Sequence, residues 1–214
     1  MIPIATRIQE SDPAALFDAA RSTLLAPYDL DTPQLERVFR QILSHQVDYA
    51  DLYFQYSRSE GWSLEEGIVK SGSFNIDQGV GVRAVSGDKT AFAYSDDISL
   101  AALESAAQAT RAIARQGTEQ RVQVVKRGAG LRLYEPRDPV ASLDDRSKVA
   151  LLEKLEGYAR SMDPRVTQVM ASLAAEYDVV LVARADGLLA ADVRPLAQLS
   201  LQVIAESHGR REQG

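Results

Sequence analysis

The sequence lacks cysteine altogether and holds only two histidines, His45 and His208, among its 214 residues. Without cysteine the chain forms no disulfide, thiolate metal site, cysteine nucleophile or Cys-x-x-Cys redox pair. Two histidines leave little for an imidazole metal site or for a Ser-His-Asp triad. Most familiar catalytic groups are therefore missing.

Positive charge and long apolar runs are also scarce. The chain has 24 Lys and Arg against 30 Asp and Glu, a net charge of −6, and no basic cluster. Nucleic acids and anionic membrane surfaces are held through Lys and Arg, so we expect neither partner. No apolar run approaches the roughly 20 residues of a spanning helix, and the first residues show no secretory signal pattern. We expect a cytoplasmic protein.

The first half of the chain changes from helical to strand periodicity. Asp12-Pro13 and Thr32-Pro33 each predict a helix start, and the second helix carries an apolar stripe at Leu35, Val38, Phe39, Ile42 and Leu43. Alternation then predicts strands over 48–58, 62–68, 79–85 and 90–94, with turns at 70–73 and 86–89. Asp97 is expected to open an Ala-rich helix that ends near Gly117.

The second half repeats this order after a connection at 127–130. Ser142 resembles a capping box that opens a helix ending at Asp163, with an inward stripe at Val149, Leu152, Leu155 and Tyr158 or Ala159. Strands are predicted over 169–177, 178–185, 188–192 and 198–205, with a type I′ turn at Asp186-Gly187. Strands follow strands, so we predict an α+β fold with antiparallel sheets, helices packed on one side and two lobes, 1–120 and 121–214.

One glycine pattern has the form of a cofactor motif. Gly79-Val-Gly-Val-Arg-Ala84 matches Gly-x-Gly-x-x-Ala, which binds a dinucleotide only where a strand leads through it into a helix. Here the glycines lead into another strand, so we predict a bulge or a close backbone approach within the sheet, and no NAD.

The histidines do not form a metal site by spacing. His208 and Glu212 are four apart, but the segment has one imidazole and a neighbouring glycine, so we expect a solvated tail. His45 lies at the end of the second predicted helix, where an imidazole favours the helix dipole.

Carboxylates and aromatics gather around the first predicted sheet. The carboxylates, which could pair for acid–base work but are more typical of a solvated surface, are Glu60, Glu65, Glu66 and Asp77. The aromatics are Tyr49, Tyr53, Phe54, Tyr56, Trp62 and Phe74. Packing against the helices is the favoured interpretation for them, and an aromatic surface that faces a partner is the alternative. We therefore predict no catalytic, cofactor-binding or metal-binding residue in this chain.

Two segments carry a family resemblance. Residues 48–55, continuing through the 22-residue run 73–94, resemble the amino-terminal region of the TldD/PmbA metallopeptidase family, and its TldD branch in particular. Residues 186–195 are similar to the second part of that region, and the resemblance spans about 35–214.

The resemblance implies a zinc-dependent peptidase that acts on peptides or unfolded segments and pairs with a PmbA/TldE-like subunit. The family's His-Glu-x-x-x-His zinc site lies in a carboxyl-terminal domain, and this sequence contains no His-Glu dipeptide. We therefore expect a truncated amino-terminal portion, inactive alone and without zinc. The alternative is a stand-alone module that binds peptides or a partner, or that self-associates.

Overall fold

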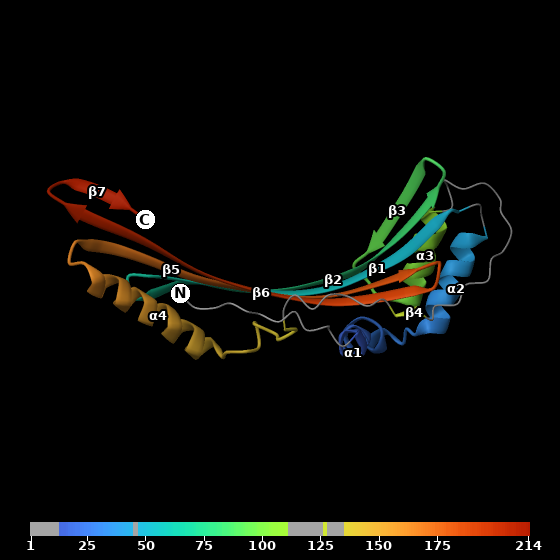
Figure 1. The fold of residues 1–214 in the computed structure, drawn as a ribbon, viewed down its shortest axis with the longest axis horizontal. Coiled ribbons are helices and arrows are strands. Elements are labelled where there is room, and N and C mark those ends of the chain that lie inside the picture. Colours follow the sequence, from blue (N-terminus) through green and yellow to red (C-terminus); the bar gives the residue numbers. More distant parts are fainter. Residues whose placement is uncertain (1–12, 45–46, 111–125, 128–134) are drawn as a thin grey trace, which may run out of the picture. The chain divides into compact units, whose positions relative to one another are not determined.

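The structure is a computed structural model that describes residues 13–44, 47–110, 126–127 and 135–214 (Figure 1). Within these ranges the elements follow in the order α1 (Pro13–Leu24), the 3-10 helix η1 (Ala26–Tyr28), α2 (Thr32–Leu43), β1 (Tyr49–Glu65), β2 (Ile68–Ser86), β3 (Lys89–Ser95), α3 (Leu100–Thr110), β4 (Lys126–Arg127), α4 (Asp145–Met162), β5 (Val166–Arg184), β6 (Leu188–Ser207) and β7 (Arg210–Gln213).

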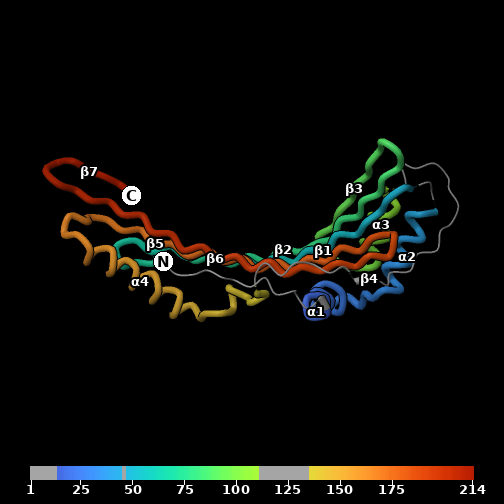
Figure 2. Tube along the Cα trace, in the orientation of Figure 1, coloured from blue at the N-terminus to red at the C-terminus, as the bar shows by residue number. Residues whose placement is uncertain are grey.

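The strands form one sheet in the order β3-β2-β1-β5-β6-β4, with β7 paired to β6 (Figure 2). β2 pairs antiparallel with β3, and β6 with β7, whereas the two residues of β4 run parallel to Leu188 and Leu189. Helices pack against this sheet. The predicted α+β class with an antiparallel sheet is confirmed.

The chain forms two compact units that share the long strands. Unit 1 comprises residues 1–56, 77–136 and 178–194, and unit 2 comprises residues 57–76, 137–177 and 195–214. β1, β2, β5 and β6 each contribute residues to both units. The expected division of the sequence into lobes 1–120 and 121–214 stays a prediction.

The helix starts follow capping rules, with shifts of one to two residues. Asp31, not Thr32, caps α2 in a capping box, because its carboxylate accepts from the Gln34 N–H and the Gln34 side chain accepts from the Asp31 N–H. The Ser99 hydroxyl accepts from the Ala102 N–H at the start of α3. The capping box predicted at Ser142 is wrong, because Asp144 caps α4 through the Ser147 N–H at 2.7 Å.

Unit 1 is built around an apolar core under the helices. The stripe predicted on α2 is buried, as is the side of α3 that carries Leu103. α3 lies against both α2 and β3. The fully buried large side chains of this unit are Leu24, Leu35, Val38, Phe39, Ile42, Leu52, Phe54, Ile98, Leu103 and Leu181. This core holds the three helices on the strands.

Unit 2 has one helix, α4, over its strands, and a smaller core. Leu64, Leu152 and Ala171 form it, with Trp62 and Leu173 packed at its margin. The inward face of α4 differs from the predicted stripe, because the buried residues are Lys148, Leu152, Glu156 and Ala159. Leu152 and Ala159 are buried as predicted, whereas Lys148 and Glu156 are buried in place of Val149 and Leu155.

The turns differ from those that the sequence favours. The turn predicted at 70–73 is wrong, because β2 runs straight through it and the chain reverses at Glu66-Gly67, both with positive φ. Gly72 instead leaves room for the Trp62 ring, 3.2 Å from where a Cβ would stand. The hairpin predicted at 86–89 is confirmed, with Gly87 at φ +60°.

The hairpin at Asp186-Gly187 is confirmed, but its predicted turn type is wrong. Only Gly187 has positive φ, and its N–H donates to the Arg184 carbonyl at 3.0 Å, so the turn spans four residues. Type I′ geometry requires positive φ at both central residues. His208-Gly209 meets that requirement, at φ 51° and 76°.

Candidate functional site

The four carboxylates that could have formed an acid–base pair have separate partners. Glu60 is buried against Lys148, whereas Glu65 accepts a hydrogen bond from the Gln168 amide. Glu66 accepts from Arg160 Nη2 at 2.6 Å. Asp77 belongs to unit 1, and the other three carboxylates belong to unit 2. No pair of these carboxylates is arranged for acid–base catalysis.

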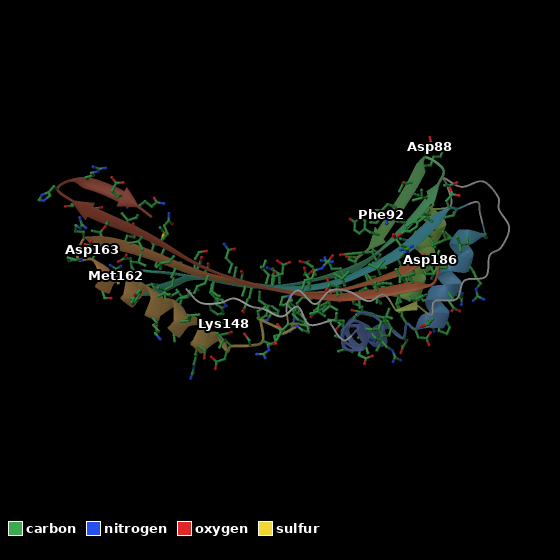
Figure 3. The ribbon with its side chains drawn as sticks, in the orientation of Figure 1. Asp88, Phe92, Lys148, Met162, Asp163 and Asp186 are labelled. Atoms are coloured by element: carbon green, nitrogen blue, oxygen red, sulfur yellow. The ribbon has the colours of Figure 1, made fainter. Side chains whose placement is uncertain are left out.

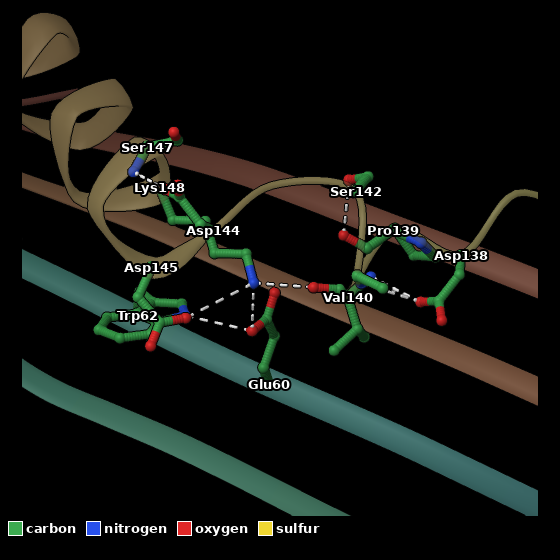
Figure 4. Close-up of polar contacts among 11 residues, drawn as sticks. Glu60, Trp62, Asp138, Pro139, Val140, Ser142, Asp144, Asp145, Ser147 and Lys148 are labelled. Atoms are coloured by element: carbon green, nitrogen blue, oxygen red, sulfur yellow. Dashed lines mark hydrogen bonds and ion pairs between the residues drawn. The ribbon is translucent and has the colours of Figure 1, made fainter.

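The most buried charged cluster of unit 2 surrounds Lys148 (Figure 4). Its Nζ donates to Glu60 Oε2 at 2.8 Å and to the Val140 carbonyl at 2.8 Å, and the two charged side chains are only 4% and 5% exposed. The Trp62 indole N–H also donates to Glu60 Oε2, at 3.4 Å. We call these four residues the polar junction.

The polar junction joins three segments that are distant in sequence. Glu60 and Trp62 come from β1, Lys148 from the first turns of α4, and Val140 from the turn before that helix. Asp138 shapes that turn by accepting from the N–H groups of Val140 and Ala141. Because each charge is neutralised by the other and both are shielded from water, the junction positions α4 on the sheet of unit 2.

The two glycines of the Gly-x-Gly-x-x-Ala pattern lie where β3 approaches β2 closely. Gly79 and Gly81 lie within β2, and no helix follows them, which confirms the predicted close approach. A Cβ on Gly79 would stand 2.6 Å from the Ser95 carbonyl oxygen, and one on Gly81 would stand 2.9 Å from the Phe92 ring. The glycines therefore admit β3 and its aromatic side chain, and the helix N-terminus that a pyrophosphate needs is absent from this part of the described chain.

A second charged cluster lies on unit 1 and was not predicted. Asp51 is buried, accepts from the Tyr49 hydroxyl at 2.6 Å and forms an ion pair with Arg83. Arg83 and Arg184 both lie over the Tyr49 ring, at 5.2 Å and 5.6 Å from its centroid. Burial raises the pKa of Tyr49, and the hydrogen bond to Asp51 raises it further. The hydroxyl therefore stays protonated at neutral pH.

Next to this cluster the sheet exposes aromatic rings. Phe92 and Tyr94 on β3 stack with centroids 6.5 Å apart and are 63% and 78% exposed. Figure 3 labels Phe92 on this strand. Phe92 pairs with Arg83 in the β2–β3 register, so the rings share a face with Arg83. Tyr53 follows Asp51 by two residues and lies on the same face, partly exposed. We call Tyr53, Arg83, Phe92 and Tyr94 the aromatic face.

The predicted aromatic group thus divides by environment. Phe54 is in the core of unit 1, Trp62 packs beside the core of unit 2, and Phe74 is exposed. Phe92 and Tyr94 were not in the predicted group. Alternation in 90–94 places both on one face, but only the structure shows that both rings are exposed.

The segment that carries His208 and Glu212 forms an exposed hairpin. His208 occupies a hairpin turn and is exposed, and Glu212 on β7 binds Arg210 at 2.6 Å instead. The tail is exposed as predicted, but it is a paired strand. His45 lies outside the described residues. Among the described residues no three His, Asp or Glu side chains come together as a metal site would require.

Most of the chain matches domains of one known protein family. Residues 50–114 match the PmbA/TldA metallopeptidase domain 1, and residues 138–214 match the PmbA/TldA metallopeptidase central domain. The chain is 46% identical over 202 residues to a Metalloprotease TldD homolog of Haemophilus influenzae, which covers 93% of this chain and 42% of that protein.

Solved structures share the fold at low sequence identity. TldE from Thermococcus kodakarensis matches with a TM-score of 0.60 and 16% identity, over 84% of this chain and 40% of that one. A candidate modulator of DNA gyrase from Thermotoga maritima matches with a TM-score of 0.66 and 15% identity, over 85% and 41%.

The chain belongs to the PmbA/TldD metallopeptidase family, as the resemblance in its sequence predicts. It contains the first and central domains of that family and spans about two-fifths of the length of the curated relative. In the ranges that the structure describes, no helix is long and apolar enough to cross a membrane.

Proposed function

We propose that this chain supplies the non-catalytic amino-terminal portion of a TldD-like zinc metallopeptidase that acts on peptides or unfolded segments. The observation that carries the proposal is the 46% identity to a TldD homolog of which the chain spans 42%. The sequence also contains no His-Glu dipeptide. The chain then contributes walls of the substrate path and contacts to a second subunit.

The residues present do not fit a zinc site. Zinc in proteins is bound by Cys, His and carboxylates, and this chain has no Cys and two His that are distant in sequence. We therefore place the zinc outside this chain and assign it no catalytic, cofactor-binding or metal residue. The proposed partners are a PmbA/TldE-like subunit and peptide substrates in the cytoplasm, and the two lobes 1–120 and 121–214 stay part of the proposal.

The test is metal analysis and a peptidase assay on the purified 214-residue chain. We expect less than one-tenth of an equivalent of zinc after dialysis and no chelator-sensitive cleavage of unfolded peptides. One tightly bound zinc per chain, or cleavage that a chelator abolishes, would contradict the proposal. A full-length TldD homolog assayed in parallel is the positive control.

The alternative is a stand-alone module that binds peptides or a partner without cleaving them. The aromatic face favours it, because exposed aromatic and Arg side chains dominate binding at protein interfaces. Replacing Tyr94 by Ala is expected to weaken capture of unfolded peptides, whereas Tyr158→Ala on α4, of comparable exposure, leaves it unchanged. Equal capture by both variants and the parent chain would contradict binding at this face.

A further inference from the structure

Helix α4 is attached to the strands of unit 2 largely through charged groups. Near its start, Lys148 forms the buried ion pair of the polar junction with Glu60 on β1 (Figure 4). Further along the helix, the Glu156 carboxylate accepts a hydrogen bond from the Gly67 N–H at 2.8 Å. Arg160, one turn later, donates to Glu156 Oε1 at 3.0 Å. Polar contacts therefore hold both halves of the helix.

The apolar part of this attachment is small. Two of the four buried residues of α4 are charged, and the two apolar ones are Leu152 and Ala159. Leu152 packs on Leu64 and Ala171, with Trp62 beside them. In comparison, α2 buries five apolar side chains over its 12 residues, whereas α4 buries two over its 18. Because the burial of apolar area is the main favourable term in packing a helix, α4 is held more weakly than α2.

The charged contacts replace little of the missing apolar area. A buried ion pair gains attraction but loses the hydration of both charges, and the two terms nearly cancel. Glu60 Oε1 is also buried and has no hydrogen-bond partner among the described residues. Such an oxygen costs free energy while it is buried and regains that free energy when water reaches it. Release of α4 is therefore less unfavourable than release of a helix held by the same number of apolar contacts.

The strands beneath α4 have an anchor that the helix lacks. β1 and β5 continue from unit 2 into unit 1, where Leu52 and Phe54 of β1 and Leu181 of β5 are fully buried. The pairing of these strands therefore does not depend on α4. The helix has no such continuation, and an 18-residue helix that contains Gly157 is marginal in water without its packing. Once released, α4 therefore loses its backbone hydrogen bonds.

We propose that α4 opens from unit 2 as a separate cooperative unit, while the strands and unit 1 stay folded. In the closed state the helix covers Leu64 and Ala171, which are 1% exposed and form an apolar strip on β1 and β5 together with Trp62 and Leu173. Opening uncovers this apolar strip. Local opening occurs in the parts of a protein that have few buried apolar contacts. α4 is thus a strap over an apolar strand face that the closed protein hides.

Native-state hydrogen exchange of the 214-residue chain, followed by NMR, tests the proposal. Relative to their intrinsic rates, the slowest amides of α4 are expected to exchange about tenfold or more faster than the slowest amides of α2. Equal protection of the two helices would overturn the proposal, because α4 would then open only when the whole chain unfolds.

A small truncation in unit 1 separates local from global opening. Ile42→Val removes one buried methylene group from α2 and is expected to speed exchange in α2 about two- to tenfold. Exchange in α4 is expected to stay unchanged, because α2 is folded both before and after α4 opens. Leu152→Ala is the matched variant on α4 and is expected to speed exchange there about thirtyfold or more. Acceleration of both helices by Ile42→Val, or no acceleration of α4 by Leu152→Ala, would overturn the proposal.

Thiol labelling gives a second measurement, because the chain has no cysteine of its own. Ala171→Cys places a thiol under α4, and Ala84→Cys places one at a strand position of unit 1 that is 0% exposed. Under native conditions the thiol at 171 is expected to react with iodoacetamide about tenfold or more faster than the thiol at 84. Equal rates at the two positions would overturn the proposal. Circular dichroism checks that both variants fold.

Discussion

The two units are stabilised by different means. Unit 1 buries large apolar side chains from three helices and the strands beneath them, whereas unit 2 buries a few apolar residues with Glu60, Lys148 and Glu156. Each buried Leu or Phe contributes about 1.5–3 kcal/mol, whereas a buried ion pair is close to neutral against an apolar replacement. We therefore expect the loss of one core side chain to cost most in unit 1 and the loss of one charged partner to cost most in unit 2.

The largest effect is expected in the core of unit 1. Phe39→Ala removes a fully buried ring from α2 and is expected to lower the free energy of unfolding by about 4 kcal/mol. Tyr94→Ala, at an exposed position, is the control and should change it by less than about 1 kcal/mol. Denaturant titration measures both, and similar losses for the two variants would contradict an apolar core as the main source of stability.

Unit 2 should instead be sensitive to charge. Lys148→Met leaves the Glu60 carboxylate buried without its cationic partner and is expected to cost about 3 kcal/mol. The double variant Glu60→Gln/Lys148→Met removes both charges and is expected to recover at least half of that loss, because no unpaired charge remains. A double variant as unstable as Lys148→Met alone would show that the pair acts through packing.

The glycines of β2 offer a finer comparison within unit 1. Gly81→Ala forces a methyl against the Phe92 ring and is expected to cost about 1–3 kcal/mol, which Phe92→Ala should relieve. Gly79→Ala meets the backbone carbonyl of Ser95, so no side-chain truncation should relieve it. Thermal unfolding of Gly81→Ala and Gly79→Ala, each with and without Phe92→Ala, checks this. If Phe92→Ala restored the stability of both glycine variants, the backbone contact at Gly79 would be contradicted.

The smallest effect concerns the exposed end of α4. Hydrogen bonds from the Arg165 side chain and backbone N–H lower the pKa of Asp163 to about 2 from its ordinary 3.8. A lowered folded-state pKa means that the contribution is present above pH 3.8 and is lost as pH falls through about 2. Carboxyl NMR should show this midpoint, and Arg165→Ala should move it toward 3.8. An unchanged midpoint would exclude the Arg165 side chain as the cause.

Local patterns predicted much of the fold. The stripe on α2, the alternation in β1 and the Gly87 and Gly187 hairpins are each readable within a few residues, because the physics that selects them is local. The turn at 70–73 was wrong for a tertiary reason. A glycine occupies position 72 because the Trp62 ring from the neighbouring strand lies 3.2 Å from where a Cβ would stand. The sequence alone does not distinguish a glycine that makes room for a neighbouring ring from one that forms a turn.

The candidate site was less predictable than the fold. Lys148 and Glu156 fall at helical spacing with Leu152, but nothing local distinguishes a buried lysine from a solvated one until its carboxylate is known. Glu60 lies 88 residues away on β1. The partnership of Asp51 with Arg83 likewise depends on the register of β1 against β2.

The sequence by itself determined the family, through the resemblance of residues 48–55, 73–94 and 186–195, and the α+β class, through its local periodicity. Only the tertiary structure decided which charges are buried, which glycines admit a neighbouring ring and which aromatic side chains of β3 are exposed. The physical reason is that burial depends on which strands become neighbours. β1 and β5 are adjacent in the sheet although they are distant in the sequence.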